Sequence, residues 1–290
     1  MTSSRSPRGP GATSGSGALG DLFLRTLSAL VMAAAALLLT WSGPWPFAFL
    51  LALAFGVLAW EWAVIRGCNG LGLPVISQTA VVAICLALAT AGYWTPAFAL
   101  LGLGILVSLL PALASSRRQA YLSALGMLLF AGPALSLLYL RSDPQYGLAA
   151  CLFVFAIVWG ADTSAYLFGR LIGGPKLAPA ISPGKTWAGF LAGLAVPALI
   201  GYAFARALAS DAPMQLSLVA LALALVAQLG DLLESATKRK FGVKDSSALI
   251  PGHGGLLDRV DGLLSAAAAA ALLALTRNMA SPGSALLIWP

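Results

Sequence analysis

The densest group of potentially reactive side chains lies in the last quarter of the 290-residue chain. Asp231, Glu234 and Ser235 come near the end of one apolar run, and Asp258 and Asp261 open the next. Offsets of three and four place residues on one face of a helix, so each group predicts an acidic face at a helix end. Mg²⁺ binds one or two carboxylates together with phosphate oxygens. We therefore predict a Mg²⁺ site, with room for a second cation, formed by Asp231, Asp258 and Asp261.

Basic side chains and a glycine-rich turn separate the two acidic groups. The turn, residues 251–255, lets backbone N–H groups approach an anion, and the helix predicted after it adds the positive end of a helix dipole. Acids for a metal, with bases and a glycine turn for phosphate, are typical of phosphoryl or nucleotidyl transfer sites. We interpret the single histidine, His253, as a donor to phosphate or a part of the turn rather than as a general base. The bases are Lys238, Arg239, Lys240, Lys244 and Arg259.

A second polar group lies between residues 160 and 189. Asp162 falls inside an apolar run, where a charge is costly and usually functional. We predict that Asp162 and Lys185 bind ligand. Ser182 and Thr186 stand where a helix is predicted to start, so they fit helix caps as well as ligand-binding residues.

Composition indicates the fold class. The chain is 59% hydrophobic and 9% charged, too little polar surface for a water-soluble protein of this size. A helix needs about 20 apolar residues to cross a bilayer, and nine stretches qualify. We predict an all-α, polytopic integral membrane bundle of about nine transmembrane helices. The stretches are 21–40, 46–65, 72–92, 95–113, 119–140, 147–169, 187–208, 214–235 and 256–276.

Charge then predicts the orientation. With nine spans, the N-terminus and the polar loops near residues 66, 115, 178 and 245 share one side of the membrane. That side receives all but three of the 17 Lys and Arg residues. Positive charge accumulates in cytoplasmic loops, so we expect the N-terminus and these loops in the cytoplasm and the C-terminus outside.

The chain is expected to divide into three parts. Residues 1–19, rich in Ser, Gly, Pro and Arg, are predicted to be a disordered tail. Residues 20–145 form the N-terminal transmembrane helices, and residues 146–280 form a catalytic transmembrane region with cytoplasmic polar loops. Glu61, between two tryptophans in the second span, is either structural or lines a cavity.

The order of these residues resembles the signature of the phosphatidate cytidylyltransferase family. That signature runs Ser, two residues, Lys-Arg, four residues, Lys-Asp, then a His-Gly-Gly turn and Asp-Arg-x-Asp. Two positions depart from the family: Thr237 replaces an aliphatic residue, and Ala188 stands where Glu is common. The motifs cover about residues 160–262. The matching residues are Ser235, Lys238, Arg239, Lys244, Asp245, Pro251, His253, Gly254, Gly255, Asp258, Arg259 and Asp261.

The resemblance implies a Mg²⁺-dependent enzyme of phospholipid biosynthesis that converts CTP and phosphatidate to CDP-diacylglycerol and diphosphate. Its partners would be CTP, phosphatidate and the lipid bilayer, with no nucleic acid, and a homodimer is considered. It would lie in a bacterial inner (cytoplasmic) membrane with its active site facing the cytoplasm. The implied catalytic residues are Asp231, Asp258, Asp261, Lys238 and Arg239. The implied substrate-binding residues are Asp162, Ser182, Lys185, Thr186, Ser235, Lys244, Asp245, His253, Gly254, Gly255 and Arg259.

Two other classes of function are weighed against this one. A CTP-dependent polyprenol or lipid kinase would handle the nucleotide similarly but transfer the terminal phosphoryl group. An ion-coupled transporter also uses intramembrane acids, but it does not explain a basic, glycine-rich loop between paired acids. For an enzyme that joins a nucleotide to a lipid, we expect a polar cavity open to the cytoplasm and to lipid, with Asp162 and Asp231 at its floor.

Overall fold

A computed structural model describes residues 15–110, 117–250 and 254–289, with side chains from residue 26 onward. It confirms a polytopic bundle of apolar helices. The N-terminal half consists of α1 (Gly15–Trp41), α2 (Pro44–Ile65), α3 (Leu73–Thr90), α4 (Trp94–Leu109) and α6 (Arg117–Arg141). The other half consists of α7 (Gly147–Leu171), α8 (Trp187–Ala207), α9 (Pro213–Lys240), α10 (Leu257–Arg277) and the short α11 (Pro282–Leu287).

The number of membrane-crossing helices is confirmed only in part. Among the described residues, seven helices are long and apolar enough to cross a bilayer, namely α2, α3, α6, α7, α8, α9 and α10. The two other predicted spans correspond to α4, which has 16 residues, and to α1, whose stretch from Thr26 to Trp41 is also shorter. The exact count of nine is therefore not confirmed. Most of the predicted 1–19 tail lies outside the described residues, and α1 begins at Gly15.

Close contacts at glycines bring α8, α9 and α10 together. A Cβ added at Gly201 of α8 would overlap Ala220 of α9. A Cβ added at Gly230 of α9 would overlap Ser265 of α10 and lie 3.3 Å from the carbonyl oxygen of Asp261. Small residues permit such close approach of membrane helices. Since Asp231 follows Gly230, this contact brings the acids of α9 and α10 to the same place.

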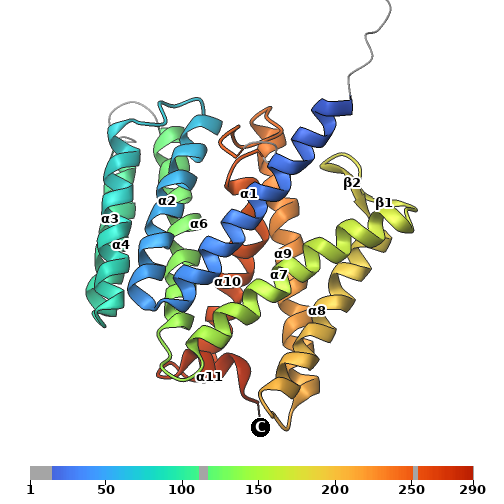
Figure 1. Cartoon of the computed structure of the whole chain (residues 1–290). Helices are drawn as coiled ribbons and strands as arrows, with labels where there is room; N and C mark the ends of the chain where they lie inside the picture. The colour runs from blue at the N-terminus through green and yellow to red at the C-terminus, as the bar shows by residue number, and fades with distance from the viewer. Residues whose placement is uncertain (1–14, 111–116, 251–253, 290) are drawn as a thin grey trace, which may run out of the picture.

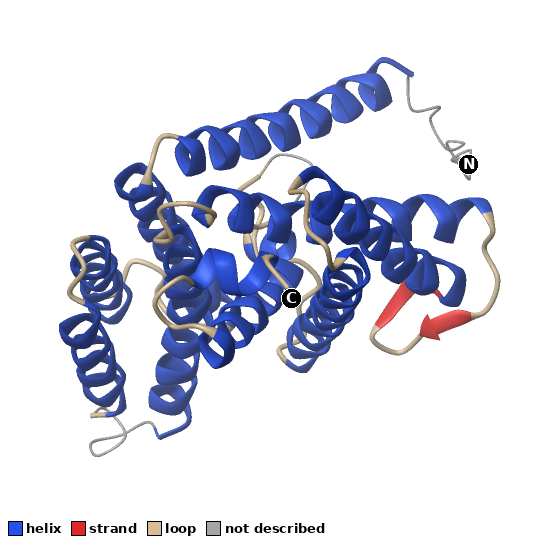
Figure 2. Ribbon diagram, turned by 90° about the horizontal axis from the view of Figure 1, so that it is seen from below, coloured by secondary structure: helices blue, strands red, loops and turns tan. Residues whose placement is uncertain are grey.

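A small antiparallel hairpin interrupts the helices, and the all-helical prediction missed it. Strands β1 (Lys176–Ala178) and β2 (Ser182–Thr186) follow α7, and Lys176 pairs with Thr186. Gly173 and Gly174 have φ of +67° and +92°, in the left-handed region that favours glycine. They turn the chain out of α7 and into the hairpin, which lies at one edge of the molecule (Figure 2).

The polar loops gather at one end of the bundle. The hairpin, the start of α1, the C-terminal end of α9 and the loop before α10 lie together at the top of Figure 1. The short helix α11 and the turn between α6 and α7 lie at the opposite end. This distribution agrees with the sidedness that the positive charges predict.

A buried carboxylate fixes the opposite end. Asp143, 3% exposed, accepts hydrogen bonds from the backbone N–H groups of Gln145, Tyr146 and Ser284 at 2.9–3.0 Å. Burial raises the pKa of this carboxyl, but the N–H donors outweigh it and hold the pKa below its usual value. Asp143 thereby ties α11 to the turn between α6 and α7.

Candidate active site

A cavity of about 1180 Å³ opens among the elements that carry the predicted residues. Its polar end is lined by α7, the hairpin, the end of α9 and the start of α10. Its other end is lined by small and apolar side chains of α1 and α2, including Ala33, Ala36 and Leu50, and by Phe155 and Trp159 of α7. The last two rings stack at 5.6 Å between centroids. One continuous space thus joins a charged surface to an apolar chamber.

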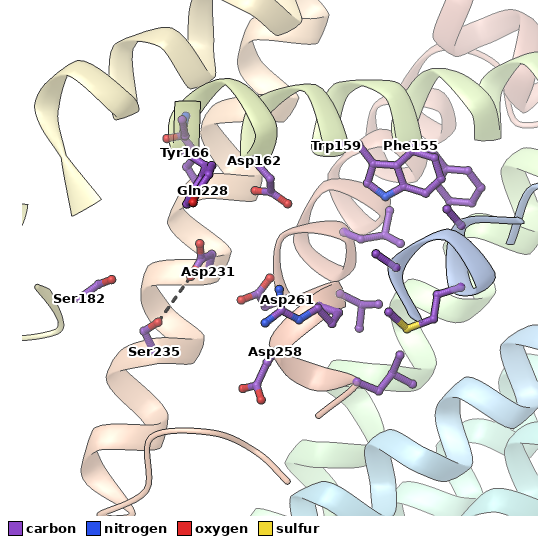
Figure 3. Close-up of a pocket in the computed structure, with 18 of the residues that line it drawn as sticks. Phe155, Trp159, Asp162, Tyr166, Ser182, Gln228, Asp231, Ser235, Asp258 and Asp261 are labelled. Atoms are coloured by element: carbon purple, nitrogen blue, oxygen red, sulfur yellow. Dashed lines mark hydrogen bonds between the residues drawn. The ribbon is translucent and has the colours of Figure 1, made fainter. Parts of the chain in front are cut away.

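Three carboxylates face the polar end from three helices. Asp162 of α7, Asp231 of α9 and Asp261 of α10 surround a common space (Figure 3). The charge of Asp261 is close enough to those of Asp162, Asp231 and Glu234 to be repelled by them. Cations reduce this repulsion. Lys185 Nζ lies 2.6 Å from Asp231 Oδ2, and the positive charge of Arg259 attracts the carboxylate of Asp162. The expected place of Asp162 and Asp231 in a cavity wall is confirmed.

The carboxylate arrangement suits a divalent cation that arrives with a phosphate ligand. Within the described residues, no three acidic, His or Cys side chains form a ready cluster that could hold a metal. Mg²⁺ usually takes one or two carboxylates and completes its shell with water and substrate phosphate. The repelling pair Asp231 and Asp261 fits that requirement. Both line the cavity, and Asp231 is at the same time paired with Lys185 at 2.6 Å.

Asp258, the third predicted metal ligand, is engaged with protein groups. Its Oδ1 lies 2.5 Å from Lys238 Nζ. Its Oδ2 accepts the backbone N–H groups of Ser246 and Gly255 at 2.9 and 2.8 Å. Lys238 also lies 2.9 Å from Glu234 Oε2, an ion pair without a well-directed hydrogen bond. A metal role for Asp258 stays a prediction, and it requires that the ion pair between Lys238 and Asp258 breaks.

At the predicted anion site, the first N–H groups of α10 already have acceptors within the protein. The N–H of Gly255 donates to Asp258, and those of Leu256 and Leu257 donate to Glu61 of α2 at 2.8 and 2.7 Å. These three N–H groups are thus occupied by two carboxylates of the protein itself. Phosphate binding by the glycine turn, with Gly255, stays a prediction and would require these hydrogen bonds to rearrange. Gly254 does not line the cavity, and His253 lies outside the described residues.

The basic residues divide into two groups. Lys185, Lys238 and Arg259 line the cavity, whereas Arg239 and Lys244 do not. Arg239 instead lies 3.4 Å from the carbonyl oxygens of Ile181 and Val243, outside the cavity. It therefore joins the end of α9 to the hairpin. The predicted residues that line the cavity are Asp162, Ser182, Lys185, Thr186, Asp231, Ser235, Lys238, Asp245, Asp258, Arg259 and Asp261.

Thr186 and Ser235 have local partners. The Thr186 hydroxyl accepts the N–H of Gly189 at 3.1 Å, so Thr186 is the N-cap of α8. The Ser235 hydroxyl lies 3.5 Å from Asp231 Oδ1 (Figure 3). That contact confirms the predicted shared face of α9, which remains helical to Lys240. Ser182 lies on β2 at the mouth of the cavity.

Sequence reasoning missed Ser246 and left the role of Glu61 open. Glu61 is fully buried and contacts the loop before α10 rather than the cavity. The sequence feature that points to Glu61 is a single acidic residue within an apolar helix. Ser246 carried no signal, because a serine in a polar loop is ordinary.

The fold defines a class, the polytopic helical membrane proteins, and in this chain the bundle contains a cavity with both charged and apolar walls. More narrowly, the chain belongs to the cytidylyltransferase family, whose sequence model matches residues 23–276. It is 39% identical over 254 residues to the phosphatidate cytidylyltransferase of Brucella abortus, covering 86% of this chain and 92% of that protein. The Staphylococcus epidermidis phosphatidate cytidylyltransferase is 38% identical over 225 residues, 75% and 84% of the two chains. The Haemophilus influenzae enzyme is 46% identical over 129 residues, 43% and 45% of the two chains.

Proposed function

We propose that this protein is a phosphatidate cytidylyltransferase, which converts CTP and phosphatidate to CDP-diacylglycerol and diphosphate. The observation that carries the proposal is the single cavity in which a charged end continues into an apolar chamber. A water-soluble nucleotide and a membrane lipid need both environments at one reacting centre. Membership of the cytidylyltransferase family supports the use of CTP.

The reaction requires one bond to form and one to break at the α-phosphorus of CTP. An oxygen of the phosphatidate monoester, already anionic at neutral pH, attacks that phosphorus, and the bond to the diphosphate leaving group breaks. Lys185 of β2, Lys238 of α9 and Arg259 of α10 line the cavity and bind the phosphates of the two substrates. A Mg²⁺ ion held by Asp231 and Asp261 would neutralise charge on the reacting phosphates.

The apolar chamber suits the acyl chains of phosphatidate. Its walls on α1 and α2 include several alanines, which leave space beside the longer side chains. Because the acyl chains come from a bilayer that is already apolar, their binding there depends on packing contacts rather than on removal of apolar surface from water. With the charged end toward the cytoplasm of a bacterial inner membrane, CTP enters from water and the lipid from the bilayer. A homodimer stays a prediction.

The direct test is product analysis. Purified protein incubated with CTP, phosphatidate and Mg²⁺ is expected to form CDP-diacylglycerol and diphosphate in equal amounts. Removal of divalent cations by EDTA should stop the reaction, and Mg²⁺ should restore it. Lipid phosphate and CDP from a polyprenol substrate, without any CDP-lipid, would instead identify a CTP-dependent lipid kinase.

The two groups of basic residues are expected to behave differently. Lys185→Ala removes a cavity cation that pairs with Asp231 at 2.6 Å, so kcat/KM for CTP should fall by about 10²-fold, since charge-assisted hydrogen bonds are the strong ones. Arg239→Ala should change kcat/KM by less than about 3-fold, because Arg239 lies outside the cavity. Steady-state kinetics of the two variants in one detergent make the comparison. Equal losses would contradict the placement of Arg239 outside the site.

A further inference from the structure

Glu61 is a buried acid in the apolar half of the molecule. It lies in α2 with an exposed fraction of 0%, and it is the only acidic residue between Thr26 and Arg141. Burial of a carboxylate is strongly unfavourable unless hydrogen bonds or counter-charges compensate for it. The donors that surround it therefore indicate why the residue is there.

The donors to Glu61 among the described residues come from the loop before α10 and from the first residue of that helix. Oε1 accepts the N–H of Leu256 at 2.8 Å and the hydroxyl of Ser247 at 2.7 Å. Oε2 accepts the N–H of Leu257 at 2.7 Å and lies 3.1 Å from the Ser246 hydroxyl. Gly255 has no side chain at this point, where a Cβ would overlap both Ser246 and Glu61. The carboxylate thus caps the N-terminus of α10 and holds Ser246 and Ser247 of the preceding loop beside it.

Ser246 connects this contact to the cavity. Its hydroxyl lies between two acceptors, 3.1 Å from Glu61 Oε2 and 3.1 Å from Asp258 Oδ2, and can donate its single proton to either of them. Its backbone N–H donates to Asp258, and Asp258 holds Lys238 at 2.5 Å. A chain of contacts therefore runs from α2 through the loop to a cation in the cavity wall.

We propose that Glu61 is a positioning residue for the active site. It does not line the cavity itself. It holds Ser246, Ser247, Leu256 and Leu257 in the arrangement that places Asp258, and through it Lys238, toward the substrate phosphates. Helix α2 is then part of the catalytic unit and not only a membrane anchor. The effect on catalysis rests on the nucleotidyl transfer proposed above, whereas the effect on the loop does not.

Glu61→Gln is the sharpest test, because the shape is kept and the acceptor set is halved. The amide has one oxygen, so its NH₂ group must face the backbone N–H of either Leu256 or Leu257. A backbone N–H can only donate, so that hydrogen bond is lost. Asp143→Asn is the matched control, since Asp143 is a buried carboxylate that also accepts backbone N–H groups, at the opposite end of the bundle. Both variants should lower the thermal stability.

Of these two variants, only Glu61→Gln should alter kcat and the hydrogen exchange of the loop before α10. For Glu61→Gln we expect kcat to fall by about 10–100-fold, as small displacements of catalytic groups do, with the KM for phosphatidate unchanged. Amide hydrogen exchange of residues 244–257 should become faster. For Asp143→Asn, kcat should stay within about 3-fold of the wild type, with exchange of residues 244–257 unchanged. Ser246→Ala and Ser247→Ala, which each remove one donor, should show the same effects to a smaller degree and replace Glu61→Gln if that variant does not fold.

Two results would overturn the inference. One is a kcat for Glu61→Gln as high as that of Asp143→Asn. The other is unchanged hydrogen exchange of residues 244–257 in Glu61→Gln, a result that does not depend on which reaction the enzyme catalyses. Failure of the wild-type protein to form any CDP-lipid would contradict the proposed function alone, and the exchange measurement would still decide the role of Glu61.

Discussion

Asp231→Asn is expected to lower the rate of CDP-diacylglycerol synthesis by about 10²–10⁴-fold, the usual range when a charge that stabilises the transition state is removed. Asp231 faces Asp261 across the polar end of the cavity and pairs with Lys185. Asparagine keeps the shape and removes the charge, so the cation loses a ligand and Lys185 loses its partner. Measuring kcat across a Mg²⁺ titration should show a lower maximum and a higher Mg²⁺ concentration for half-maximal rate. Asp261→Asn should behave in the same way.

Asp211→Asn is the matched control for this prediction. Asp211 is an exposed acid in the turn between α8 and α9, far from the cavity lining. Its replacement should leave both the maximum and the Mg²⁺ dependence unchanged. A near-normal rate for Asp231→Asn at every Mg²⁺ concentration would refute the assignment of Asp231 to the cation.

The local parts of the site could be predicted because spacing along a helix is enough to specify them. The offsets among Asp231, Glu234, Ser235 and Lys238 predict one face, and contacts from Ser235 to Asp231 and from Lys238 to Glu234 confirm it. The same reasoning placed Asp258 and Asp261 at the start of the next helix, which begins at Leu257. Both inferences need only the helical period.

The partner of the N–H groups of Leu256 and Leu257 could not be predicted, because it is distant in the sequence. A helix N-terminus favours an anion, and from the sequence we predict that this anion is a substrate phosphate. The structure supplies Glu61 instead, 195 residues before Leu256. No spacing rule relates the two, since their contact depends on how α2 packs against the second half of the bundle.

The hairpin was missed for a different physical reason. Its strands contain Lys, Pro, Gly and Ser, and their one β-branched residue, Thr186, gives no alternating pattern of the kind that identifies a strand. Backbone pairing, the N-cap at Thr186 and the contact of Ile181 with Arg239 hold it in place. Such support comes from tertiary structure, so Ser182 and Lys185 could be predicted as site residues without the element that carries them.

Lys238→Met is expected to reduce both stability and activity. The Lys238 ammonium lies 2.5 Å from Asp258 and 2.9 Å from Glu234, and the three side chains are only 7–12% exposed. Removing one partner of a buried ion pair costs about 3–5 kcal/mol, because the remaining charge has no compensation. Here two carboxylates lose their shared cation. Thermal unfolding in detergent should show a much lower midpoint, and kcat should fall by at least about 10²-fold because the cavity loses a phosphate-binding cation.

The double variant Lys238→Met with Glu234→Gln separates the two effects. Glu234 has no hydrogen-bond partner for either carboxylate oxygen, whereas Asp258 keeps the N–H groups of Ser246 and Gly255. Neutralising Glu234 should therefore restore much of the lost stability, while activity stays low because the Lys238 ammonium is still missing from the phosphate site. Lys240→Met, at an exposed position of the same helix end, should change stability by less than about 0.5 kcal/mol. If activity returned together with stability in the double variant, Lys238 would be a structural cation and the phosphates would be bound by Lys185 and Arg259 alone.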